Sequence, residues 1–275
     1  MTAATDPIVA EIAAADSRRR LSFRVTFILT WVVLLGAFII WLLTLPENSL
    51  TGRKPFDPEF IIEKLPFLLA GVPMTIMVSI ASIVFAVLLA LIGALGRLSG
   101  SAIVYGVASL YVSVVRGTPL IVQILFVFWA VPQIIPELSR VPAPIMGVVA
   151  LAFNYGAYMT EIFRAGIQAV PQGQREAAMA LGMSDRRIMG KIVLPQATRI
   201  VTPAIGNEFI AMIKDSALVS WIGVQELLWR ARIEGSANFR SLEMYLTAAL
   251  IYWILTMVLS LAQDRLEKRM ARGDR

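Results

Sequence analysis

Two acidic side chains stand seven residues apart in a segment that is long enough and apolar enough to be a membrane crossing. Glu208 and Asp215 both lie within residues 200–221. A helix turns about 100° per residue, so the two carboxylates fall within about 20° of each other on one face. A carboxylate at the centre of a spanning helix costs ~2.5–3.5 kcal/mol, so this face is expected to avoid lipid. We predict that it faces a solute path or a partner, where the acids would receive an ammonium group or a cationic side chain.

Two polar neighbours belong to the same predicted path and also offer an alternative. Asn207 precedes Glu208, and Lys214 precedes Asp215. Lys214 could neutralise Asp215 in an internal ion pair near the outer interface, and the acids would then be structural. A site for a neutral solute would have little reason to hold two acids on one face. The pattern therefore favours a cationic or zwitterionic substrate.

A further charge interrupts an apolar stretch at residues 116–119, which read Arg-Gly-Thr-Pro. Residues 98–115 and 117–136 are apolar on either side. Gly and Pro break helices at membrane depth only where protein or a water-filled cavity covers the freed backbone. Two full crossings here would place the Arg-rich segment 171–199 outside, so the positive-inside rule predicts one broken crossing, with Arg116 lining the path. The alternative is an arginine that snorkels to the interface.

Glu161 and Arg164 stand three residues apart in the apolar segment 145–168, so they can pair on one helix face. An internal ion pair near the interface is the simplest interpretation of these two residues.

The composition argues against an enzyme. The chain has no histidine and no cysteine, which removes the commonest general base, the commonest metal ligand and thiolate chemistry. A membrane-embedded enzyme would have to use the acids and the lysine within the spans, and no Ser–Lys or paired-Asp spacing stands out. No G-x-x-x-x-G-K-[ST] phosphate loop is present, so the chain cannot be its own ATPase. We expect no catalytic residue, no metal site and no cofactor bound by this chain.

A polar island occupies residues 171–199, where five basic residues face only two acids. The alanines around residue 178 favour a helix, and Gly182 can end it in the left-handed conformation. Ser184 is a predicted N-cap for a second short helix over 185–191, which should stop before Pro195. Taken alone, this pattern also fits a surface helical hairpin with a charged face.

Four motifs occur along the chain in one order: Arg116-Gly117-Thr118-Pro119-Leu120, Gly156-Ala157-Tyr158-x-x-Glu161-Ile162-x-Arg164, Pro171-x-Gly173-Gln174-x-Glu176-Ala177-Ala178 and Lys214-Asp215-Ser216. The third motif, followed by Gly182 and by Ile192-Val193-Leu194-Pro195, resembles the cytoplasmic coupling loop of ABC importers. Together the motifs resemble the permease subunits of the polar amino acid uptake family, of the histidine, glutamine and arginine type. The resemblance covers roughly residues 65–263.

The resemblance implies a permease subunit that moves a polar amino acid, basic ones included, or a related small solute across a bacterial inner membrane. It implies a second permease subunit, an extracytoplasmic binding protein, and cytoplasmic ATPase subunits that carry ATP and Mg. Nucleic acid is not among the implied partners. The ATPase subunits would dock on the coupling loop, through Gln174, Glu176, Ala177, Ala178, Gly182 and Pro195.

The hydrophobic content sets the fold class. The chain has 275 residues, of which 57% are hydrophobic, above the 45–50% of soluble domains. Apolar runs of 18 residues or more can cross a bilayer core of ~30 Å. We predict an all-α integral membrane protein with about six transmembrane helices, a five-helix permease core and an extra N-terminal span. The predicted crossings are 26–45, 65–96, a broken 98–136, 145–168, 200–221 and 244–263.

The distribution of Lys and Arg predicts the topology. Most of the 25 basic residues fall in the two tails and the coupling loop, which the positive-inside rule assigns to the cytoplasm. We predict three parts: residues 1–64 with the extra span, the permease domain 65–263 with its coupling loop 171–199, and a basic tail 264–275. An ion-coupled secondary transporter is the alternative function. That class carries inverted repeats, which this sequence lacks, and it leaves the coupling loop without a role.

Overall fold

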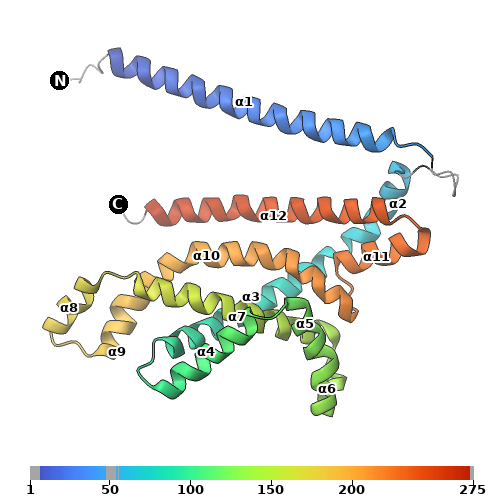
Figure 1. The fold of residues 1–275 in the computed structure, drawn as a ribbon. Helices are drawn as coiled ribbons and strands as arrows, with labels where there is room; N and C mark the ends of the chain where they lie inside the picture. The colour runs from blue at the N-terminus through green and yellow to red at the C-terminus, as the bar shows by residue number, and fades with distance from the viewer. Residues whose placement is uncertain (1–6, 48–53, 55, 273–275) are drawn as a thin grey trace. The chain divides into compact units, whose positions relative to one another are not determined.

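A computed structural model describes residues 7–47, 54 and 56–272. Every regular element in these ranges is a helix, and the predicted all-α class is confirmed (Figure 1). The chain forms two compact units, Met1–Pro58 and Glu59–Arg275.

The first unit contains one long helix, α1 (Pro7–Leu43). Its part Val25–Leu43 is long and apolar enough to span a membrane, in agreement with the predicted crossing 26–45. Most large apolar side chains of that part are exposed, as expected of a helix surrounded by lipid.

The second unit begins with α2 (Pro58–Leu69) and α3 (Val72–Arg97), which together are long and apolar enough for one crossing. The helix therefore starts seven residues before the predicted crossing 65–96. A break at Gly71 separates the two parts. This position requires glycine, because a Cβ there would lie 2.8 Å from the backbone of Leu227. Small buried residues on α3 let it pack closely along α7, as expected of helix contacts in lipid.

The predicted break at residues 116–119 is confirmed. Helix α4 (Ala102–Arg116) and the segment Leu120–Ile134 are bent relative to each other by 106° there, a geometry that fits a broken span or a re-entrant loop. The second arm consists of α5 (Leu120–Leu125), the π-helical turn η1 (Phe126–Ala130) and α6 (Val131–Ile134), followed by the short 3₁₀ helix η2 (Pro136–Arg140).

Helix α7 (Ala143–Gln168) leads into the coupling loop, which contains α8 (Gln172–Ala180) and α9 (Asp185–Ile188). The predicted turn is confirmed, since Gly182 has φ +75. The predicted stop before Pro195 is wrong. The chain continues through the π-helical turn η3 (Met189–Val193) directly into α10 (Leu194–Asp215). Pro195 therefore lies within a continuous helical run, directly after the π-helical turn that interrupts the regular α-helical hydrogen bonding.

The predicted loop 222–243 also needs correction, because it contains a helix. After the 3₁₀ helix η4 (Ser216–Ile222), α11 (Leu227–Asn238) packs Leu227 and Ala231 against Met244 of α12 (Ser241–Arg272). The mixed charges of residues 222–243 led to the prediction of a loop, because the apolar face of α11 consists of few residues. Helix α12 starts three residues before the predicted crossing 244–263 and continues into the predicted tail.

In the described part of the chain, four helices are long and apolar enough to cross a membrane, and there are five if the bent pair α4–α6 is one span. The sixth predicted crossing, over α10, does not meet this standard among the described residues, because its sequence is too polar. The polar residues of α10 include the predicted path residues Asn207, Glu208, Lys214 and Asp215.

Candidate functional site

Asp215 is held in place by a tyrosine from the neighbouring helix. Tyr155 of α7 is buried, and its hydroxyl donates a hydrogen bond of 2.8 Å to Asp215 Oδ2 at the end of α10. Glu208, two turns earlier on α10, is half-buried and lies on the same side of the helix. The two predicted acids therefore lie beside α7, away from a purely lipid surface.

The other two predicted path residues of α10 are exposed, and neither pairs with the acids in the described part of the chain. The Asn207 side chain accepts a hydrogen bond of 3.1 Å from Gln263 Nε2 of α12. Lys214 forms no ion pair with Asp215 in the described part of the chain, where the hydrogen-bond partner of Asp215 is Tyr155. The contact of Asp215 is therefore on the α7 side of the helix.

Arg116 lies against the same helix. Its guanidinium stands 5.1 Å from the ring centre of Tyr158 on α7, and its side chain is exposed. Tyr155 and Tyr158 are three residues apart, about 4.5 Å along the helix axis. Helix α7 thus contacts the Asp215 carboxylate through Tyr155 and the Arg116 guanidinium through Tyr158. An α-amino acid carries both charges and could use both groups.

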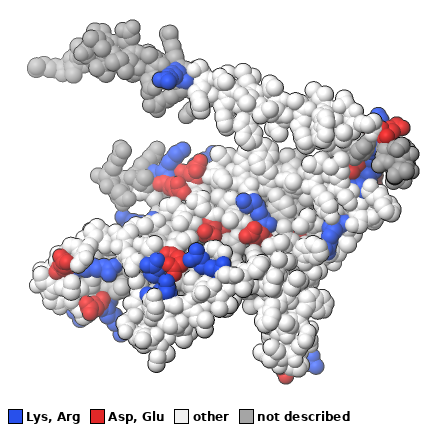
Figure 2. Space-filling view, viewed as in Figure 1, with Lys and Arg blue, Asp and Glu red and all other residues white. Residues whose placement is uncertain are grey.

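A second charged cluster lies where α3, α4 and α7 meet. Glu161 pairs with Arg164 at 2.7 Å, which confirms the predicted pairing, and with Arg97 of α3 at 3.2 Å. Arg97 also donates to Ser109 Oγ of α4. The sequence did not reveal the role of Arg97, because only the fold brings residue 97 beside residue 161. Figure 2 shows acidic and basic side chains gathered over α10 and over this junction.

The coupling loop is fixed to α7 and α10 by its own core. Ala178 is buried with Ile167 of α7 and Ala197 of α10 in one apolar cluster. The guanidinium of Arg175 donates to the Ile167 carbonyl, and Gln196 of α10 donates to Gln174. The loop is therefore attached to the adjacent ends of both helices.

The remaining predicted coupling residues stay on the surface. Those with exposed side chains or backbone are Gln174, Glu176, Ala177, Gly182 and Pro195. The Glu176 carboxylate accepts a hydrogen bond of 2.9 Å from its helical neighbour Gln172. Leu181 is 83% exposed, an apolar side chain beside these polar ones. Ser184 precedes α9 as predicted but makes no side-chain cap hydrogen bond.

One buried acid outside the spans was missed. Glu226 caps α11 by accepting from Trp229 N at 2.7 Å, and it also accepts from Tyr252 of α12 and Thr75 of α3. Burial raises the pKa of the Glu226 carboxyl, although these hydrogen bonds oppose the rise. The signal was an acidic residue just before an apolar helix start.

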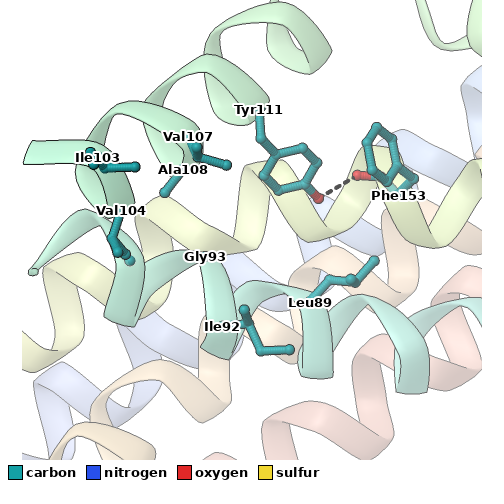
Figure 3. Close-up of a pocket in the computed structure, with 10 residues that line it drawn as sticks. Leu89, Ile92, Gly93, Ile103, Val104, Val107, Ala108, Tyr111 and Phe153 are labelled. Carbon is teal, nitrogen blue, oxygen red and sulfur yellow. Dashed lines mark hydrogen bonds between the residues drawn. The ribbon is translucent and has the colours of Figure 1, made fainter.

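An apolar pocket between α3, α4 and α7 has a volume of about 420 Å³ and contains none of the predicted path residues. Leu89 and Ile92 face Val107 across it, and the Tyr111 hydroxyl donates to the Phe153 carbonyl at 2.7 Å (Figure 3). The candidate site is therefore the charged face and not this pocket.

Known proteins share this fold and much of this sequence. Residues 82–272 match the family described as binding-protein-dependent transport system inner membrane component. The L-cystine transport system permease protein TcyB of Bacillus subtilis (strain 168) is 42% identical over 236 residues, 85% of this chain and 98% of that protein. The glutamine transport system permease protein GlnP of Escherichia coli (strain K12) is 36% identical over 215 residues, 78% of this chain and 98% of that protein.

A solved structure agrees with these relatives. The crystal structure of an amino acid ABC transporter with histidines has a chain that is 40% identical, with a TM-score of 0.72, over 78% of this chain and 99% of that one. The chain therefore belongs to the family of binding-protein-dependent transport system inner membrane components, the permease subunits of ABC importers, and is a transporter subunit rather than an enzyme.

Proposed function

We propose that this permease carries a polar α-amino acid, basic ones included, along the face of α7. The observation that carries the proposal is the pair of tyrosine contacts, Tyr155 to Asp215 and Tyr158 to Arg116. Asp215, with Glu208, would attract the ammonium group or a cationic side chain, and Arg116 would attract the carboxylate. The relatives named for cystine and glutamine transport carry substrates of this class, which supports the proposal.

The chain works with partners that supply energy and substrate. Two cytoplasmic ATPase subunits would bind ATP and Mg and dock on the exposed residues of the coupling loop. A second permease subunit would complete the path, and an extracytoplasmic binding protein would deliver the amino acid. The family description, a binding-protein-dependent transport system, supports this assembly. No nucleic acid takes part, and no cofactor is held by this chain.

The anchoring of the coupling loop supports a mechanism for alternating access. Arg175 and the core around Ala178 tie the loop to α7 and α10. Closure of the ATPase subunits would therefore shift these two helices together, and with them the Tyr155–Asp215 contact. The path would alternate between inward- and outward-facing states whose populations the nucleotide sets.

The orientation follows from charge. We place both termini and the coupling loop on the cytoplasmic side of a bacterial inner membrane, because Lys and Arg cluster in those segments. The loops around η2 and α11 would then face outward, where the binding protein arrives.

Co-purification tests this assignment. The permease would be extracted in mild detergent and its stable partners identified by mass spectrometry. We expect an ATPase subunit in every preparation, and an amino acid as the ligand of the binding protein that stimulates it. Purification of the chain as a lone transporter that takes up solute in response to an ion gradient would contradict the proposal.

A further inference from the structure

The break between α4 and α5 frees a backbone carbonyl group, and one side chain satisfies it. Pro119 has no N–H, so the carbonyl of Val115, four residues earlier, lacks its helical donor. Gln123 Nε2 lies 2.8 Å from Val115 O, 3.1 Å from Thr118 O and 2.8 Å from Thr118 Oγ1. The Gln123 amide thus replaces the donor that Pro119 cannot supply.

The residues beside the break complete this arrangement. Thr118 Oγ1 donates to Val114 O at 2.9 Å, and Gly117 N donates to Ser113 O at 3.0 Å. A Cβ at Gly117 would lie 2.8 Å from Ser113 O, so this turn requires glycine. Backbone at membrane depth is stable only when its polar groups are satisfied. The Arg-Gly-Thr-Pro motif and Gln123 together meet that requirement.

Helix α7 holds both sides of the break. The amide of Asn154 is 5% exposed and donates to Gln123 Oε1 at 3.1 Å. One turn further along α7, Tyr158 lies under Arg116, the last residue of α4. Gln123 is therefore the point at which α7, α4 and α5 are joined by hydrogen bonds.

We propose that Gln123 is a positioning residue for transport. By fixing the break, it sets where Arg116 stands on the path, and through Asn154 it makes the break follow α7. The structural half of this proposal depends only on the hydrogen bonds described. The part that concerns Arg116 rests on the proposed function.

Spin-label distances test the structural half. The chain has no cysteine, so Ile103→Cys and Ile134→Cys would carry the only labels. Both side chains are exposed, and each label lies about 20 Å from the break along its own helical arm. The labelled permease would be assembled with its partners, diluted with unlabelled permease, and measured by electron–electron double resonance. The two arms then report the bend directly.

Gln123→Met keeps the size of the side chain and removes all of its hydrogen bonds. We expect a shifted mean distance and a broader distribution. The matched control is Gln133→Met, because Gln133 also donates to a carbonyl of this span, at 3.0 Å, but from an exposed site. We expect the control to keep the wild-type distribution. A wild-type distribution in Gln123→Met would overturn the proposal. If that variant fails to assemble, Asn154→Leu should shift the arms by removing only the tie to α7.

A double-mutant cycle on ATP-driven uptake tests the second half. If Gln123 acts through Arg116, the Arg116→Gln substitution should reduce uptake by a much smaller factor in Gln123→Met than in wild type. In Gln133→Met the two effects should simply multiply. Independent effects of Gln123→Met and Arg116→Gln would overturn the positioning role. If Arg116→Gln leaves wild-type uptake unchanged while Gln123→Met still shifts the arms, the assigned path fails and the structural role of Gln123 stands.

Discussion

The hydroxyl of Tyr155 on α7 donates a 2.8 Å hydrogen bond to Asp215 on α10. This bond joins the two helices whose other ends anchor the coupling loop. One pair of helices therefore carries both the candidate substrate acids and the site at which the ATPase subunits would act. A motion imposed at the loop would reach the acids without any further moving part.

Tyr155→Phe removes that bond and keeps the ring. A hydrogen bond to a charged group contributes about 1.5–3 kcal/mol, so we expect uptake to fall by roughly tenfold or more. Uptake by the reconstituted complex would be compared with Tyr245→Phe, since Tyr245 is exposed on α12. Equal uptake by the two variants would show that the Tyr155–Asp215 bond has no part in transport.

Glu208→Gln and Asp215→Asn test the acidic face separately. Each change removes one negative charge and keeps the size of the side chain. We expect slower uptake and a weaker preference for cationic over neutral amino acids, with Asp215→Asn the stronger because Tyr155 holds that carboxylate in place. Competition uptake with lysine-like and neutral amino acids measures both effects. Wild-type rates and preference in both variants would make these acids structural.

Gly182→Val tests the coupling loop. Gly182 has φ +75, a conformation that a β-branched residue resists. The strain is of order 1–3 kcal/mol and local, so the transmembrane helices should still fold. We expect lost uptake and lost stimulation of ATP hydrolysis, with a thermal unfolding midpoint lowered by roughly a few degrees. Gly190→Val is a useful comparison, because a Cβ at Gly190 meets open space. Normal transport by Gly182→Val would contradict the coupling role of this turn.

Labelling at Ser184→Cys tests the orientation. Residue 184 is exposed between α8 and α9, and the chain offers no other cysteine. A membrane-impermeant maleimide should react in inside-out vesicles and not in intact cells. Reaction from outside the cell would reverse the proposed topology.

The pKa shift of Glu226 predicts a change in stability with pH. Burial raises its pKa in the folded state, so the folded protein binds this proton more tightly than the unfolded chain does. Its contribution to stability is full below the unfolded pKa of about 4.3 and is lost as pH rises through the folded pKa. The Glu226→Gln variant should not lose stability in this way as pH rises, because glutamine does not titrate. The unfolding midpoints of the wild type and the variant would be compared from low to neutral pH, and their difference measures the pH-dependent contribution of Glu226. A difference that does not change with pH would contradict the prediction.

The sequence predicted those features that depend on residues close to one another along the chain. The positive φ of Gly182, the break before Pro119 and the Glu161–Arg164 pair could all be predicted, because each depends on residues within one turn or one helix. The helix hidden in residues 222–243 could not, since its stability comes from packing on α12 and from the Glu226 cap.

The candidate site was also predictable only in part, because it depends on packing between different helices. The predicted path residues were chosen for charge within apolar segments, and Asp215 and Arg116 do lie against one helix. The residues that hold them, Tyr155 and Tyr158, were visible in the sequence only as polar residues of a span. Which helix faces which is a property of the fold, and no spacing within one helix reveals it.

The central claim is that this chain is an amino acid permease driven by a separate ATPase. The most direct measurement is uptake of a labelled amino acid into vesicles that contain the permease and its ATPase, with the binding protein added outside. We predict uptake that requires ATP inside the vesicles, that stops when either protein partner is omitted, and that falls in Asp215→Asn. Uptake by the permease alone, driven by an ion gradient without ATP, would contradict the account.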